Sequence, residues 1–365
     1  MWLAMIKKLI LQGSAKEIGR QHGSQASDQV MQSLETYEKL FYGYKKLTWK
    51  QAREVALQHV NAIEKLDHQL IEEMEGVAEG AGVDFEDILA LNARSEIALA
   101  DYHGSNFSDG CTAIAITSPL IEETIIGQNW DWKAQQKNSL VLLEIHKPSK
   151  PIVKIVTEGG MIGKIGFNSN GLGVCFNALL TNKCSDTIPI HIGLRAVLDS
   201  YSLSEAISKI KGGNIAAAAS YLIGYDDQKG NGIAVNVEVS PVGIDLVGEN
   251  DGRLVHTNHL LSHSLKKNGL TDMNEFIFED SMLRKKRAEQ LISRKIMNKE
   301  PLNMDAFKEW FSDQLNAPNS INHFENEFVP EHRRMETVFS IIMNLSKRKM
   351  LLCIGKPSES FYEEV

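Results

Sequence analysis

The chain changes character near residue 105, and this change restricts its fold more than any other feature. Residues from about 14 to 100 are rich in Glu, Gln, Lys, Ala and Leu, whereas the rest of the chain carries many short β-branched runs bounded by turn residues. Strands joined by tight turns, with helices between them, favour antiparallel sheets covered by helices. We therefore predict an α+β fold with a mainly helical N-terminal segment.

The N-terminal segment has the periodicity of amphipathic helices. Apolar residues recur there at steps of three and four, at Leu57, Val60, Ile63, Leu66, Leu70 and Met74. The Gly-Ala-Gly-Val stretch at 80–83 predicts the end of one helix. Asp84 and Asp87 predict the start of the next.

The remainder of the chain predicts strands more often than helices. We expect strands at 112–117, 124–127, 140–145, 152–156, 233–239, 243–246 and 254–257, and a hairpin over 337–354. Tight turns are expected at 159–160 and 168–171. Helices are expected from about Leu194, after a capping box from Ser202 to Glu205, and over 280–298.

Composition excludes several classes of protein. The net charge is −8 and no Lys/Arg block is long enough to follow a phosphate backbone, so no nucleic-acid partner is expected. No stretch reaches the roughly 18–20 apolar residues of a membrane span, and the first lysines follow the apolar residues, unlike a signal peptide. The four cysteines are widely spaced without a C-x-x-C pair, which favours reduced thiols and a cytoplasmic protein.

The Gly110–Cys111 bond is the most informative chemical feature. Small and turn-forming residues dominate 103–110, so this stretch is a predicted linker, and it ends at this bond. Cleavage there would leave Cys111 with both a thiol nucleophile and an α-amine, whose ordinary pKa of about 8 suits a base. The alternative is a structural cysteine, because free cysteines are usually buried apolar residues.

A polar stretch, Gly-Gln-Asn-Trp-Asp-Trp at 127–132, follows about twenty residues after Cys111. That interval accommodates a strand, a turn and a returning strand, which would bring Asp131 beside Cys111. A carboxylate there could hold the α-ammonium group or orient a substrate amine, with Asn129 as a supporting residue. The alternative is an ordinary aspartate in a turn between core tryptophans.

The stretch His-Thr-Asn-His at 256–259 offers another set of polar groups. The amide of Asn258 could stabilise an oxyanion. His256 and His259 could bind metal, but their rings would point to opposite faces of a strand, and no ligand cluster accompanies them. A hydrogen-bonded role is therefore favoured for both, and no metal is expected.

Two further basic positions and one glycine-rich run complete the candidates. Arg333 or Arg334, just before a predicted strand, could bind a carboxylate with two parallel hydrogen bonds or simply be solvated. Arg94 could form an ion pair or lie on a surface helix face. The run at 159–164 fails the spacing of a phosphate-binding loop and is interpreted as turns.

Together these stretches resemble the acyl-CoA:6-aminopenicillanate (isopenicillin N) acyltransferase family, a cysteine branch of the N-terminal-nucleophile hydrolases. The matching stretches are residues 76–82, 91–96, 109–112, 127–131, 166–172 and 256–259, in order along the chain. The resemblance implies a four-layer αββα fold and self-cleavage between Gly110 and Cys111. It also implies that segment 1–110 stays bound as a small subunit to the catalytic segment 111–365.

Carried over by position, the resemblance makes Cys111 the nucleophile, Asp131 its polar partner and Asn258 the oxyanion donor. Arg334 falls near the family's late arginine, but the adjacent Arg333 leaves the choice between the two open. The implied activity is cleavage of a linear amide or thioester through a Cys111 acyl-enzyme, with transfer to water by default or to an amine. No cofactor is expected, and an acyl-CoA is a candidate substrate.

Two other functions compete with this one. The first is an unprocessed, non-catalytic relative that binds a small molecule or a partner chain. The second is a cysteine peptidase in which His256 or His259 assists Cys111.

Overall fold

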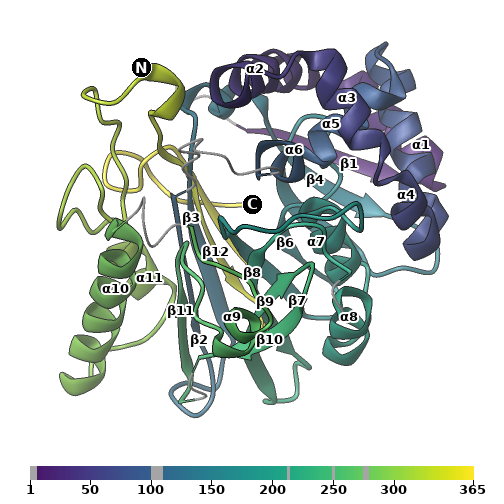
Figure 1. The fold of residues 1–365 in the computed structure, drawn as a ribbon. Helices are drawn as coiled ribbons and strands as arrows, with labels where there is room; N and C mark the ends of the chain where they lie inside the picture. The colour runs from purple at the N-terminus through teal and green to yellow at the C-terminus, as the bar shows by residue number, and fades with distance from the viewer. Residues whose placement is uncertain (1–5, 100–109, 212–213, 249–250, 274–278) are drawn as a thin grey trace.

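The computed structural model describes residues 6–99, 110–211, 214–248, 251–273 and 279–365. Two β-sheets lie face to face in the middle of the molecule, and helices cover the outer side of each (Figure 1). The predicted four-layer αββα architecture is therefore confirmed.

The first sheet has eight strands and is antiparallel except at one edge. Its strands are, in spatial order, β1 (Lys7–Gln12), β4 (Leu140–His146), β5 (Val153–Glu158), β6 (Ile165–Asn168), β7 (Leu172–Ala178), β8 (Ala219–Asp226), β9 (Gly232–Ser240) and β10 (Gly243–Val247). β1 runs parallel to β4 at the edge of this sheet. Sequence analysis named no strand at β1, β6, β7 or β8, although it expected the turn at 168–171 that joins β6 to β7. In β1 only Leu9 and Leu11 are buried, so its apolar pattern is too short to be recognised.

The second sheet has six strands, all antiparallel to their neighbours. They are β11 (Arg253–His256), β2 (Gly110–Ile116), β3 (Ile125–Trp132), β12 (Glu336–Asn344), β13 (Lys349–Ile354) and β14 (Glu363–Glu364). The predicted tail hairpin is confirmed as β12 and β13. β3 continues five residues past the predicted 124–127 strand, because Gln128 and Asn129 are buried and hydrogen-bonded instead of forming a turn.

Helices of the N-terminal segment lie on the side of the first sheet, together with two helices from the middle of the chain (Figure 1). They are α1 (Ala15–Gln25), α2 (Ser27–Lys45), α3 (Trp49–Leu57), α4 (Val60–Ala81), α5 (Phe85–Asn92), α6 (Arg94–Leu99), α7 (Ile190–Leu198) and α8 (Leu203–Ile210). Asp84 and Asp87 form the predicted cap of α5. The apolar stripe from Leu57 to Met74 is not one helix, because α3 ends at Leu57 and Asp67 interrupts the helical dihedrals of α4.

Glycines allow α1 and α4 to pack with their backbones almost in contact. A Cβ atom on Gly19 would lie 1.9 Å from the carbonyl oxygen of Glu73, and one on Gly76 would lie 2.2 Å from that of Lys16. The glycines of the 76–82 stretch therefore include a packing residue of this helix pair.

The remaining helices are α9 (His263–Lys267), α10 (Glu279–Met297), α11 (Met304–Phe311) and the short 3-10 helices η1 (Ala134–Ser139) and η3 (Glu331–Arg333). Of these, α10 and α11 form the other outer layer, while α9 contacts β10 and the two short 3-10 helices contact α2. An apolar cluster between the second sheet and α10–α11 is separate from the larger cluster shared by the two sheets and the N-terminal helices. Within the described ranges, no helix is long and apolar enough to cross a membrane.

Candidate active site

Cys111 is the second residue of β2 and is fully buried. The register of the second sheet pairs Cys111 with Trp130 of β3 and Gly110 with Asp131. The returning strand thus brings Asp131 beside the Gly110–Cys111 bond, as the strand–turn–strand spacing predicts.

The backbone at Gly110 lies tightly against its surroundings. A Cβ atom there would lie 3.1 Å from Oδ2 of Asp131 and 3.1 Å from Cε of Met335. Asp131 is held on its other oxygen by the hydroxyl of Thr337, which donates to Oδ1 at 2.6 Å and accepts the main-chain N–H of His323 at 2.9 Å. A fixed carboxylate therefore lies directly beside the bond in question.

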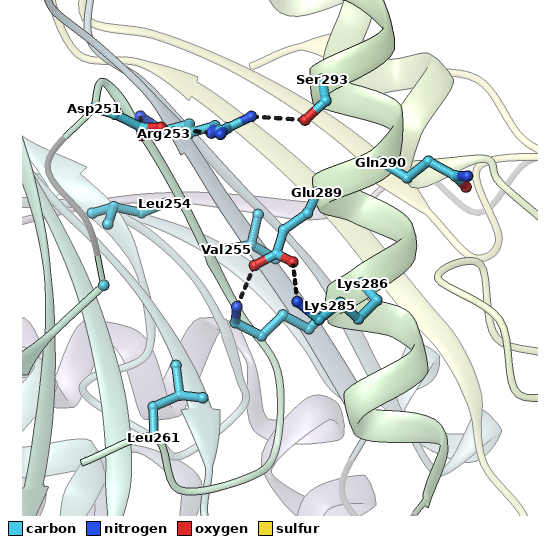
Figure 2. Close-up of a pocket in the computed structure, with 11 residues that line it drawn as sticks. Asp251, Arg253, Leu254, Val255, Leu261, Lys285, Lys286, Glu289, Gln290 and Ser293 are labelled. Atoms are coloured by element: carbon cyan, nitrogen blue, oxygen red, sulfur yellow. Dashed lines mark hydrogen bonds and ion pairs between the residues drawn. The ribbon is translucent and has the colours of Figure 1, made fainter. Parts of the chain in front are cut away.

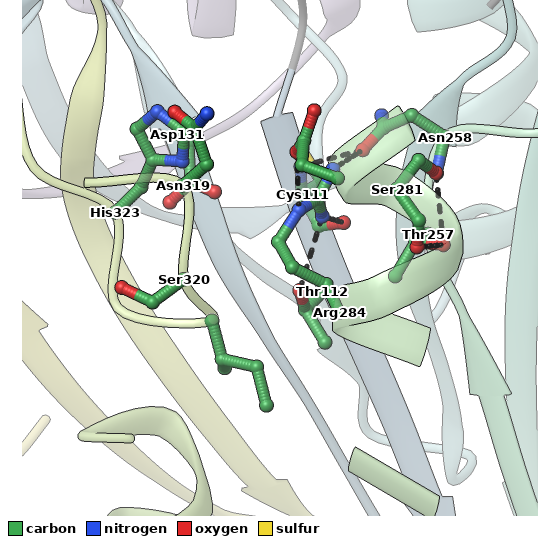
Figure 3. Close-up of polar contacts among 12 residues, drawn as sticks. Cys111, Thr112, Asp131, Thr257, Asn258, Ser281, Arg284, Asn319, Ser320 and His323 are labelled. Carbon is green, nitrogen blue, oxygen red and sulfur yellow. Dashed lines mark hydrogen bonds and ion pairs between the residues drawn. The ribbon is translucent and has the colours of Figure 1, made fainter. Parts of the chain in front are cut away.

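Asn258 holds the other side of the same bond (Figure 3). Its Oδ1 accepts the main-chain N–H of Cys111 at 2.8 Å. Its Nδ2 donates to the carbonyl of Ala178 at 3.1 Å, and its main-chain N–H donates to the hydroxyl of Ser281 at 2.8 Å. Because Ala178 belongs to β7 of the first sheet, the amide nitrogen of Asn258 lies between the two sheets.

Arg284 of α10 also belongs to this site, and sequence analysis missed it. Its guanidinium donates to the carbonyl of Cys111 at 2.6 Å and to Oδ1 of Asn258 at 3.0 Å (Figure 3). In the sequence it directly precedes the basic residues 285–287. The helical period is the signal that could have found it, because Arg284 lies four and seven residues before the buried Ala288 and Leu291, on the same face of α10.

Asn177 of β7 is a second residue that sequence analysis missed. It is buried, and within the described ranges neither its Oδ1 nor its Nδ2 has a hydrogen-bond partner. The register places it beside Ser220, which in turn pairs with Glu238, a residue that reaches across to His256 on the second sheet. The Asn177 amide therefore faces the space between the sheets, the side on which Cys111 contributes to the shared core.

The two histidines of the 256–259 stretch have different partners. Both ring nitrogens of His256 are engaged, Nε2 with Glu238 at 2.9 Å and Nδ1 with the carbonyl of Thr257 at 2.7 Å. Nδ1 of His259 contacts the hydroxyl of Ser281 at 2.8 Å, and burial lowers the pKa of His259 to about 3. These contacts go to Glu238, Thr257 and Ser281, and the described residues contain no cluster of three or more His, Cys, Asp or Glu side chains that could hold a metal.

Arg94 does not lie on a surface helix face, so that interpretation was wrong. It is 1% exposed, and its Nε lies 3.6 Å from Oε2 of Glu158. Its guanidinium also lies over the rings of Tyr37 and Trp132, at 5.3 and 5.1 Å from their centroids. Sequence analysis could not place it, because its partners come from other parts of the chain.

Two other predicted residues contact parts of the chain other than the Gly110–Cys111 bond. Nδ2 of Asn129 donates to the carbonyls of Phe311 and Ile321, both at 2.9 Å, and so fastens α11 to β3. Arg334 donates to the carbonyls of Val329 and Glu327 in its own loop, both at 3.1 Å.

Arg333 and Arg334 are both half-buried. Arg334 directly precedes Met335, the residue whose side chain lies against Gly110.

A hollow of about 580 Å³ lies on one side of α10, against β11 (Figure 2). Its charged residues pair with one another, since Lys285 and Lys286 contact Glu289, and Arg253 contacts Asp251. The lining includes none of the predicted site residues.

The family model described as acyl-coenzyme A:6-aminopenicillanic acid acyl-transferase matches residues 121–359 of this chain. The chain belongs to this acyltransferase family. A relative in the family, described as the 40 kDa form of acyl-coenzyme A:6-aminopenicillanic-acid-acyltransferase from Emericella nidulans, is 33% identical over 351 residues, 95% of this chain and 92% of the relative.

Two solved structures are similar to this acyltransferase family member at low identity. A Caenorhabditis elegans orthologue of N-acylethanolamine-hydrolyzing acid amidase is 17% identical, with a TM-score of 0.43, and the match covers 65% of this chain and 93% of that one. A mutant conjugated bile acid hydrolase from Clostridium perfringens is 14% identical, with a TM-score of 0.46 and coverage of 70% and 96%. Family membership itself supports an enzyme of acyl transfer.

Proposed function

We propose that this enzyme cleaves itself between Gly110 and Cys111 and then uses Cys111 as an N-terminal nucleophile. The observation that carries the proposal is the setting of that one bond. Its nitrogen is held at 2.8 Å by Asn258, and the carboxylate of Asp131 lies beside its glycine. A structural cysteine in a strand requires neither of these groups.

In the proposed processing step, the thiolate of Cys111 attacks the carbonyl carbon of Gly110. The C–N bond then breaks, the nitrogen takes up a proton to become the α-amine, and Gly110 is left as a thioester on the sulfur. Water opens the thioester, which gives a Gly110 carboxylate and restores the thiol. Oδ1 of Asn258 already accepts from this nitrogen and can accept from the amine product.

In the mature enzyme, the α-amine would take the proton of the thiol. The thiolate would attack an acyl donor, the leaving amine or thiol would take up the proton, and water or an amine would accept the acyl group. Nδ2 of Asn258 and the amide of Asn177 are the donors we propose for the oxyanion. The family supports an acyl-CoA or an amide as the acyl donor.

Retention of the N-terminal segment after cleavage is part of the proposal. β1 forms the edge of the first sheet beside β4. The pair between Glu73 and Arg195, at 2.7 Å, joins the two segments in the buried interior. Breaking one peptide bond removes none of these contacts, so we propose that 1–110 and 111–365 remain a heterodimer.

The test is the intact mass of the freshly purified protein under denaturing conditions. Two masses, for 1–110 and 111–365, are expected for the wild type and for the control Cys175→Ala, which removes another fully buried thiol. A single mass near 40.7 kDa is expected for Cys111→Ala. A single mass for the wild type after prolonged incubation would overturn the proposal and favour an unprocessed binding protein.

A further inference from the structure

Arg284 is a buried cation in contact with the proposed nucleophile's own backbone. It is 2% exposed, and its contacts with Cys111, Thr112 and Asn258 are drawn in Figure 3. Nη1 donates to the Cys111 carbonyl at 2.6 Å and to the hydroxyl of Thr112 at 3.2 Å. Nη2 donates to Oδ1 of Asn258 at 3.0 Å, and Nε donates to Asp280 at 2.9 Å.

We propose that Arg284 is a positioning residue of the acyl-transfer site, which fixes the orientation of the Asn258 amide relative to Cys111. The proposal rests on the proposed function of the previous section. A guanidinium carries only donors, in a planar and rigid arrangement. The Asn258 atom that faces it must therefore be the oxygen, which turns Nδ2 the other way, toward Ala178 and the space between the sheets.

Cleavage makes this contact more important. In the intact chain the amide N–H of Cys111 can only donate, so it also requires the oxygen of Asn258 to face it. After cleavage the same nitrogen is an amine, which can donate or accept and no longer distinguishes the two ends of the amide. Arg284 then remains as a donor-only group on that oxygen. Its loss should thus affect acyl transfer more than processing.

The experiment compares Arg284→Met and Arg284→Lys with Arg287→Met. Arg287 is a matched control, because it lies one turn further along α10 and pairs with Asp313 instead of the site. Both arginines line a second hollow beside α10, which has a volume of about 620 Å³. Processing is followed by intact mass. Acylation of Cys111 is followed by the burst of p-nitrophenol from p-nitrophenyl acetate, a small activated ester.

For Arg284→Met we expect a processed enzyme whose acylation rate at saturating ester is lower by about a hundredfold, with KM nearly unchanged. Lysine at position 284 restores part of the rate, because it keeps a donor but not the planar group. Arg287→Met matches the wild type. Equal rates for Arg284→Met and Arg287→Met would overturn the proposal.

A rescue experiment separates positioning from a general loss of structure. In Arg284→Ala, added methylguanidinium can reach the space left by the arginine side chain through the hollow of about 620 Å³ that Arg284 lines. We expect it to raise the acylation rate of Arg284→Ala at least tenfold and to leave the wild type and Arg287→Ala unchanged. No rescue in a folded variant would contradict positioning by a guanidinium. A wild type that neither processes nor gives a burst would instead contradict the proposed function.

Discussion

The two helical layers are attached to their sheets in different ways. The N-terminal layer shares the large apolar cluster and is also joined to the rest of the molecule by buried polar contacts that reach distant strands and helices. Examples are Arg195 with Glu73 and the hydroxyl of Tyr37, which donates to Glu158 at 2.5 Å. The α10–α11 layer packs on the second sheet mainly through an apolar cluster, and its buried polar contacts are concentrated around Ser281 and Arg284 at the start of α10. The buried helical members of this cluster are Ala288, Leu291, Ile292, Ala306, Phe307, Trp310 and Phe311.

This difference matches what each layer has to do in the proposed enzyme. Apolar burial is strong but non-directional, whereas buried hydrogen bonds and ion pairs specify one arrangement of the groups that form them. The α10–α11 layer always remains on the same chain as its sheet. The N-terminal layer would lose its covalent link on cleavage, so directional contacts are the means by which it could keep its position.

Of the changes considered, removing Arg195 should weaken the attachment of the N-terminal layer most. Arg195 binds both oxygens of Glu73, at 2.7 and 2.8 Å, and its Nε donates to Asp199 at 2.9 Å, all in the buried interior. Arg195→Met leaves two buried carboxylates without their cation, and we expect a loss of about 3–5 kcal/mol in the free energy of unfolding. Urea denaturation measures this loss, and size-exclusion chromatography in mild urea should detect early release of the N-terminal segment from processed protein.

The control for Arg195 is Arg53→Met. The partners of Arg53 are Asp84, Glu86 and Asp87, all within the N-terminal segment and near its surface. We expect a much smaller change in stability and no release of the segment. If both variants release the segment at the same urea concentration, the buried pair is not what retains it.

Local patterns predicted the parts of this molecule that depend on local sequence. Alternation and turn residues indicated β2, β12 and β13, and the interval between Cys111 and Asp131 was enough to place these residues on neighbouring strands. The parallel pairing of β1 with β4 could not be predicted in this way. More than a hundred residues separate the two strands, and the burial pattern of β1 is that of a half-exposed edge.

Charged residues were harder to predict than strands. A sequence shows that Arg94, Arg195 and Arg284 are basic, but not that each is buried against partners from distant parts of the chain. Arginines of this kind are usually solvated, so the general expectation favours a surface position. The candidate site was therefore predicted around its proposed nucleophile, Cys111, while the cation that contacts the main chain of Cys111 was missed.

Acid provides a second, smaller way to weaken the N-terminal layer. Nε2 of His22 accepts the main-chain N–H of Gly160 at 3.2 Å, and burial lowers the pKa of His22 to about 4. In the unfolded chain this histidine titrates near its ordinary value of about 6.5, so the unfolded state binds more protons between the two values. Stability therefore falls as the pH drops from 6.5 toward 4, by up to about 3 kcal/mol for this one group.

The urea midpoint measured across this pH range should fall less steeply for His22→Gln, whose amide oxygen can still accept from Gly160. His323 is a suitable comparison, because burial also lowers its pKa to about 4 but it lies beside the second sheet. His323→Gln should flatten the same slope without changing the release of the N-terminal segment. An unchanged slope in His22→Gln would show that this histidine is not the group responsible.

The smallest expected effect compares single methyl groups in the two layers. Ile292 of α10 and Ile88 of α5 are both fully buried in apolar clusters. Replacing either with valine should cost about 1 kcal/mol in the free energy of unfolding, as measured by the urea midpoint. Because the expected loss in the free energy of unfolding is the same for both variants, any difference in retention of the N-terminal segment must come from the layer in which the methyl group lies. We expect Ile88→Val alone to promote its release in mild urea. If Ile292→Val promotes release equally, the two layers unfold as one cooperative unit, and the contrast in their contacts has no consequence for the retention of the segment.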